Sequence, residues 1–85
     1  MEYVIFVFRS RSDSVGLSEI LNARGVRNAL INTPKEAKVG CGLSVKIEKS
    51  DYAKVLAILS TLRHVPPYAA FIVKHSVRGK ELRRI

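Results

Sequence analysis

The chain has 85 residues, of which 47% are hydrophobic and 26% charged, and its formal net charge is +8. A chain of this length has room for one hydrophobic core, and folding is expected to bury about 60–65% of the surface that the unfolded chain exposes. No segment approaches the roughly 18 uncharged apolar residues that a membrane-spanning helix needs. We therefore expect a single soluble domain.

The N-terminal sequence and the cysteine content indicate a cytoplasmic protein. Glu2 stands where a signal peptide carries a basic residue, and Arg9 and Arg11 interrupt the apolar run that follows. Cys41 is the only cysteine, which excludes an internal disulfide and a cysteine-based zinc site. We expect no metal or other cofactor, and a thiol that is kept reduced in the cytoplasm.

The first half of the chain predicts a strand, a helix and a second strand. Residues 2–8 form a β-branched and aromatic run that is typical of a central strand. Ser10 has the spacing of a helix-capping residue, and apolar residues at helical spacing continue until Gly25, where we expect the helix to end. Residues 26–32 show a weaker strand pattern, as expected at a sheet edge. Residues 33–42 predict an irregular loop with a short helical turn.

The second half predicts a strand, a helix and a last strand. Residues 43–48 alternate strictly between apolar and polar, which makes this the clearest strand in the chain. Asp51 offers a cap for a helix with an apolar stripe of period 3.6, and this helix should end near His64 because two prolines follow. Residues 69–73 predict the last strand, and residues 74–85 a basic tail that is mobile or only partly docked.

The order of these elements predicts an α+β fold, namely a ferredoxin-like βαββαβ sandwich with a four-stranded antiparallel sheet and two helices on one face. Residues 1–73 would form this domain, and residues 74–85 the C-terminal tail. Since the first strand is apolar at every position from Tyr3 to Phe8, one of its two apolar sets should remain exposed on the open face of the sheet. Such a surface indicates an interface, and we expect a homodimer.

The loop between the second and third predicted strands carries the most informative motif. Thr-Pro-Lys-Glu at residues 33–36 is followed by Gly-Cys-Gly at residues 40–42 and then by the alternating strand. This pattern, over most of the chain, resembles the small bacterial Se/S carrier protein-like family. The resemblance implies a ferredoxin-like fold and a carrier role in sulfur or selenium metabolism, with Cys41 as the thiol that accepts persulfide or selenide. Its partner would be a cysteine desulfurase or another relay protein.

A carrier thiol must be exposed and must ionise readily, and the residues around Cys41 suit this chemistry. Flanking glycines remove side-chain obstruction and allow backbone amides to turn inward, while nearby lysines favour the anion. In the alternative interpretation, Cys41 is a small buried filler at the start of a strand, and the threonine and glutamate of the motif only cap a short helix. The residues of the supporting loop are Gly40, Gly42, Thr33, Pro34, Glu36 and Lys38.

The rival function is binding of nucleic acid or of an acidic partner, in which the cysteine is structural. The net charge and the aromatic residues of the predicted sheet support this function. Binding of this kind would weaken steeply with added salt. The third strand lacks the aromatic residue with which RNA-recognition domains stack a base. The cations that could contact an anion are Lys74, Arg78, Lys80, Arg83 and Arg84.

We do not expect an enzyme. The two histidines, His64 and His75, are far from Cys41 in the sequence, and neither forms part of a recognisable catalytic motif. His64 follows the last apolar turn of a predicted helix, where a cation interacts favourably with the helix dipole.

Overall fold

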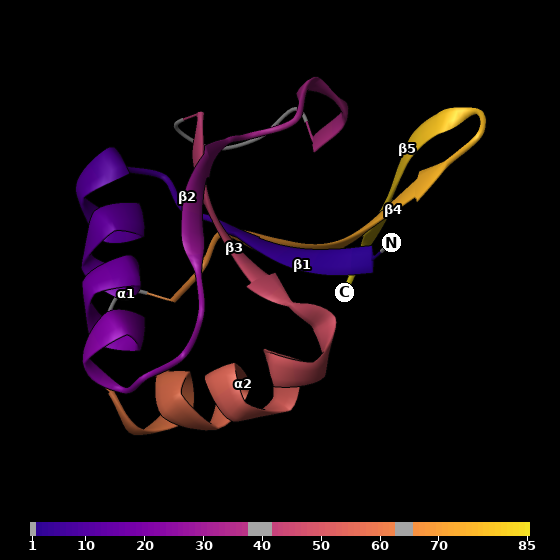
Figure 1. Cartoon of the computed structure of the whole chain (residues 1–85). Coiled ribbons are helices and arrows are strands. Elements are labelled where there is room, and N and C mark those ends of the chain that lie inside the picture. Colours follow the sequence, from indigo (N-terminus) through magenta and orange to yellow (C-terminus); the bar gives the residue numbers. More distant parts are fainter. Residues whose placement is uncertain (1, 38–41, 63–65) are drawn as a thin grey trace.

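The computed structural model describes residues 2–37, 42–62 and 66–85. These residues form an α+β fold with one antiparallel sheet in the strand order β2-β3-β1-β4-β5 (Figure 1). The elements are β1 (Glu2–Val7), α1 (Arg11–Ala23), β2 (Ala29–Asn32), the 3-10 turn η1 (Lys35–Ala37), β3 (Leu43–Glu48), the 3-10 turn η2 (Lys49–Asp51), α2 (Tyr52–Thr61), β4 (Ala69–Ser76) and β5 (Gly79–Arg84).

The sheet has five strands, so the predicted number of four is wrong. The residues predicted as a tail lengthen β4 to Ser76 and then form β5, which pairs with β4 along its whole length. Two features explain the extra strand. Gly79 has a φ of 112°, a backbone conformation that glycine adopts without strain, and this permits a tight turn after Ser76. Beyond the turn, Leu82 lies opposite Val73 and supplies the one apolar side chain that β5 buries partly.

The main core lies between the helices and one face of the sheet, where both helices contribute. Val4 and Phe6 of β1 and Val45 and Ile47 of β3 are at most 2% exposed. Their partners are the apolar faces of α1 and α2, as the period of the sequence predicts. The buried members of this cluster are Val4, Phe6, Phe8, Leu17, Leu21, Val26, Val45, Ile47, Val55 and Ile58.

The second sheet face is also packed, which the sequence analysis did not foresee. Tyr3, Ile5 and Val7 are 7%, 0% and 0% exposed. Ala37 of η1 and Leu82 of β5 belong to the same apolar cluster, so segments far apart in the sequence meet over this face. The expectation that one apolar set of this strand stays exposed is wrong, because η1 and β5 pack against the set that faces away from the helices. The predicted dimer loses the apolar surface from which it was inferred.

The end of α1 follows the predicted glycine stop, and it also shortens β2. Gly25 has a φ of 73°, and its N–H donates to the carbonyl of Asn22 at 3.2 Å. The N–H of Val26 donates to the carbonyl of Leu21 at 2.9 Å, which completes a Schellman motif. Because Val26 is committed to the helix end and buried in the main core, β2 begins only at Ala29.

The two helix starts differ. Ser10 caps α1 as predicted, since its hydroxyl accepts a hydrogen bond from the N–H of Asp13 at 3.2 Å. Asp51 stands at the N-cap position of α2 but makes no capping hydrogen bond with its side chain, and η2 leads the chain into the helix instead. The helix α2 ends at Thr61, with Leu62 as its C-cap, a few residues before His64, near which its end was predicted and which lies outside the described residues. Within the described ranges, no helix is long and apolar enough to cross a membrane.

Candidate functional site

The loop that carries the Thr-Pro and Cys-Gly motif is closed at its neck by hydrogen bonds between its two ends. The N–H of Thr33 donates to the carbonyl of Gly42 at 2.9 Å. The hydroxyl oxygens of Thr33 and Ser44 lie 2.6 Å apart, within hydrogen-bonding distance. Gly42 has a φ of 90°, which a residue with a side chain adopts only with strain. The residue next to Cys41 is therefore held in a defined backbone conformation.

The neck is tied to the start of α1 as well. The hydroxyl of Ser14, which is fully buried, donates to the carbonyl of Leu43 at 2.9 Å. At the same end of the sheet, the N–H of Tyr68 donates to the carbonyl of Val7 at 2.8 Å, and the Arg9 guanidinium lies 4.6 Å from the centre of the Tyr68 ring. Three connecting segments thus converge at the end of β1.

The remaining motif residues divide between the interior and the surface. Pro34 is buried and Ala37 is 7% exposed, while Lys35 and Glu36 are exposed to solvent. The carbonyl of Pro34 accepts a hydrogen bond from the N–H of Ala37 at 3.0 Å, which forms the single turn of η1. Four predicted positions, including the thiol itself, lie outside the described residues: Lys38, Gly40 and Cys41 from the site, and His64.

Capping is not the role that the structure gives to Thr33. Its hydroxyl lies within hydrogen-bonding distance of that of Ser44 on β3, so in place of the predicted capping box with Glu36 there is a contact between the residue after β2 and β3. The sequence analysis missed Ser44 because a polar residue on the outer side of an alternating strand is ordinarily solvated. Ser44 is instead 0% exposed. Ser14 was missed for a similar reason, since serine is common on the polar face of a helix.

The bond between Thr33 and Ser44 leads to a test of the neck. Thr33→Val removes one hydroxyl and leaves that of Ser44 buried without this partner, which should lower the free energy of unfolding by about 1–3 kcal/mol. The double variant Thr33→Val/Ser44→Ala removes both groups and should be more stable than Thr33→Val alone. Urea denaturation followed by circular dichroism measures the loss for these two variants and for Ser44→Ala alone. A double variant that loses the sum of the two single losses would show that the pair is not coupled.

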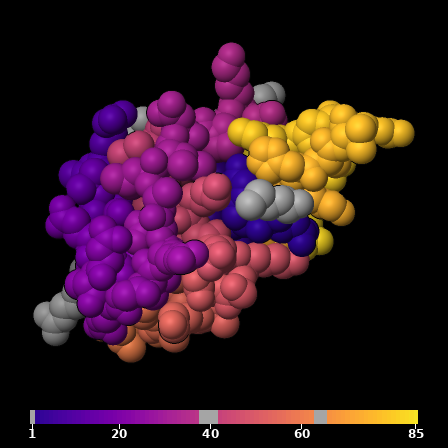
Figure 2. All heavy atoms as spheres, viewed as in Figure 1, coloured from indigo at the N-terminus to yellow at the C-terminus, as the bar shows by residue number. Residues whose placement is uncertain are grey.

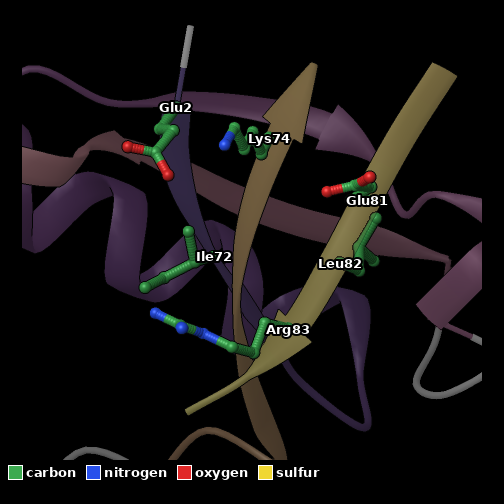
Figure 3. Close-up of a pocket in the computed structure, with 6 residues that line it drawn as sticks. All are labelled: Glu2, Ile72, Lys74, Glu81, Leu82 and Arg83. Atoms are coloured by element: carbon green, nitrogen blue, oxygen red, sulfur yellow. The ribbon is translucent and has the colours of Figure 1, made fainter. Parts of the chain in front are cut away.

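All five predicted anion-contact cations lie on β4, β5 or the turn between them, and all are exposed. At the base of this hairpin, Glu2, Lys74 and Glu81 lie side by side on β1, β4 and β5 and alternate in charge. They line a hollow of about 320 Å³ together with Ile72, Leu82 and Arg83 (Figure 3). A hydrogen bond from Lys49 at 3.1 Å, together with the charge of Lys49, lowers the pKa of the Glu2 carboxyl, and the charge of Lys74 acts in the same direction.

The aromatic residues of the sheet are not available as a platform for stacked bases. Tyr3 and Phe71 are 7% and 8% exposed, although both lie on the face without helices. The Tyr3 ring is covered by Lys46, whose Nζ lies 4.3 Å from the ring centre, and the Tyr3 hydroxyl lies 3.2 Å from Nε2 of His75. Binding of nucleic acid through stacking on this face is therefore disfavoured.

Across residues 2–37, 42–62 and 66–85, no group of three or more histidine, cysteine or acidic side chains could hold a metal ion. In comparisons with known proteins, residues 2–67 match the model of the family described as "Putative Se/S carrier protein-like". The match covers the loop with both of its motifs and ends before β4. No curated protein and no solved structure matches the chain significantly.

Proposed function

Because the chain belongs to the Se/S carrier protein-like family, we propose that it carries sulfur or selenium on the thiol of Cys41. The domain would be a ferredoxin-like frame to which β5 is added, since β2, β3, β1 and β4 follow one another in the sheet as antiparallel neighbours. In the sequence, Cys41 falls in the connection between β2 and β3, directly before Gly42.

The observation that carries this proposal is the closed neck of the loop within the family match. The bond from the Thr33 N–H to the Gly42 carbonyl joins the two motifs and anchors the residue that follows Cys41. A carrier needs such an arrangement, because the thiol must be presented on a segment that can enter a partner's active site while its base stays fixed. Lys35 is exposed at the start of the same loop and adds positive charge, which favours a thiolate nearby.

The chemistry requires no cofactor. The Cys41 thiolate would attack the terminal sulfur of a persulfide on a donor protein, the donor's cysteine thiolate would leave, and Cys41 would then hold the persulfide. In the second step, a nucleophile on the acceptor would attack the same terminal sulfur and release the Cys41 thiolate. No net oxidation occurs in either exchange. The protein would thus act as a cytoplasmic carrier between a desulfurase or similar donor and an acceptor, and not as an enzyme in its own right.

The test is intact-mass analysis after incubation with a cysteine desulfurase and cysteine, or with a selenocysteine substrate. We expect the wild-type chain to gain the mass of one sulfur or selenium atom, which a thiol reductant should remove. The Cys41→Ser variant should gain no mass, because Cys41 is the only cysteine in the chain. Arg27→Gln serves as the control, since it keeps the thiol and changes one exposed residue outside the loop, and it should gain the same mass as the wild type.

Two results would contradict the proposal. If Cys41→Ser gained as much mass as the wild type, the added atom would be bound to a residue other than Cys41. A wild-type protein that gains no mass and whose thiol also resists alkylation under native conditions would indicate a buried, structural cysteine.

A further inference from the structure

The β4–β5 hairpin extends beyond the rest of the sheet. The last described pair between β1 and β4 joins Glu2 to Lys74, whereas β4 and β5 continue to pair as far as Ser76 and Gly79. Figures 1 and 2 show this segment projecting from the body of the molecule. At about 3.4 Å per residue, the three residues from Lys74 to the turn give the ribbon a reach of about 10 Å.

The projecting ribbon is held in one conformation. In its turn, the Ser76 hydroxyl accepts a hydrogen bond from the N–H of Arg78 at 3.3 Å and donates to the carbonyl of Gly79 at 3.1 Å. Its base is fixed by the contact of 3.2 Å between His75 and the Tyr3 hydroxyl of β1. Little conformational entropy would be lost if this ribbon bound a partner, because it is already ordered.

Cations lie on both faces and in the turn of the ribbon, and on one face Lys74 is flanked by Glu2 and Glu81. Lys74 and Lys80 lie on its opposite faces, because they occupy neighbouring cross-strand pairs, and Arg78 lies in the turn. All three are exposed. Val77, at the tip, is 107% exposed, so the ribbon ends in an apolar side chain that contacts nothing. A partner that fits this pattern must be anionic on both sides of the ribbon and must offer a small apolar contact at its end.

We propose that the β4–β5 ribbon inserts into the major groove of duplex DNA. This groove is about 12 Å wide and about 8.5 Å deep and admits a two-stranded β-ribbon. Lys74 and Lys80 would then face the phosphates of the two strands, and Arg78 and Val77 would reach the base edges, where a thymine methyl group offers the apolar contact. The ribbon lies outside the family match and at the end of β1 opposite the neck of the Cys41 loop, so this function is independent of the carrier role.

Other anionic partners fit less well. Val77 is the only large apolar residue of the turn. Its insertion into a membrane would also bring the charged side chain of Arg78 into the apolar layer, which is energetically costly. A flat acidic protein surface would contact one face of the ribbon and leave the cations of the other face unused. Duplex RNA has a major groove that is too deep and narrow for side chains to read.

The experiment measures binding of a labelled DNA duplex of about two helical turns by fluorescence anisotropy, as a function of salt. With two phosphate contacts, from Lys74 and Lys80, affinity should fall about 12-fold between 50 and 200 mM salt, and with one contact about 3–4-fold. We expect the larger loss of affinity for the wild type and the smaller loss, that of one phosphate contact, for Arg78→Gln/Lys80→Gln. Arg27→Gln/Lys54→Gln removes two exposed cations elsewhere on the molecule and should keep the wild-type salt dependence.

Further arms separate the possible partners. Duplex RNA of the same sequence should bind at least about fivefold more weakly than DNA. Glu81→Gln removes the carboxylate beside Lys74 and should raise the affinity for DNA, and Cys41→Ser should leave it unchanged. The proposal is overturned by equal losses in the two double variants, by equal binding of duplex RNA, or by polyglutamate that competes as well as unlabelled DNA at the same charge concentration.

Discussion

Phe6→Ala should lower the free energy of unfolding by about 3–5 kcal/mol, as is typical when a fully buried aromatic residue is truncated. Phe6 is 1% exposed and lies on the central strand between Val45 of β3 and Ala70 of β4. Its ring stacks on that of Tyr52, with centroids 6.1 Å apart, so it joins α2 to the sheet. The backbone of β1 is held by two neighbouring strands and cannot close the cavity.

The size of this loss matters because the whole domain is small. A chain of 85 residues is expected to be stable by about 4–13 kcal/mol, so the variant would lose at least about a quarter of this stability and, at the lower end of the range, would be close to unfolding. Leu56→Ala is the matched control, since Leu56 lies on α2 but is 43% exposed. Its loss should be within about 0.5 kcal/mol. Urea denaturation of both variants gives the comparison, and a Phe6→Ala loss below 1 kcal/mol would mean that the main core is not packed as described.

The parts of the fold that sequence predicts well are those governed by one local rule. The strand predicted from the alternation of residues 43–48, the glycine stop of α1 and the Ser10 cap each depend on residues within a few positions of one another, and the structure confirms all three. The bounds of β2 were wrong because the N–H of Val26 is used by the helix end instead of by the sheet. The local sequence pattern does not reveal whether a residue between two elements, such as Val26, belongs to the helix end or to the strand.

The second sheet face shows a different kind of limit. The sequence showed that one of the two apolar sets of β1 faces away from the helices; in the structure this set is Tyr3, Ile5 and Val7, and η1 and β5 pack against it. Neither segment has a strong apolar pattern of its own. Ala37 and Leu82 are single residues that become significant only when the chain folds back, so the sequence indicated an exposed surface where the structure has a second cluster.

At the candidate site, motif and structure contribute different things. The motif makes Cys41 the candidate thiol, and the family match spans it, whereas no distance among the described residues bears on that assignment. The structure adds the bond between Thr33 and Gly42 and the buried hydroxyls of Ser14 and Ser44, which no motif contains. Serine carries little positional information in a sequence, because the same hydroxyl can be solvated, can cap a helix or can bridge two strands.

Deleting residues 77–85 tests the fifth strand directly and should lower the free energy of unfolding by about 2–4 kcal/mol, from lost apolar burial and an unpaired strand edge. Leu82 packs against the second cluster and lies opposite Val73, which is 0% exposed in the intact chain. The deletion would open Val73 and Phe71 to solvent. A mobile basic tail would contribute almost nothing, so the two descriptions of this segment predict different stabilities.

The deletion also removes charge, and the control must separate the two effects. Lys80→Gln/Arg83→Gln keeps the strand and Leu82 but removes two exposed cations, so its stability should stay within about 0.5 kcal/mol of the wild type. Hydrogen exchange provides a second measurement: the amides of β4 that face β5 should exchange faster in the truncated chain, while those of β3 that face β1 should keep their relative protection. A truncated chain as stable as the wild type would show that β5 is not part of the cooperative fold, and the DNA-binding ribbon would then lack its rigid base.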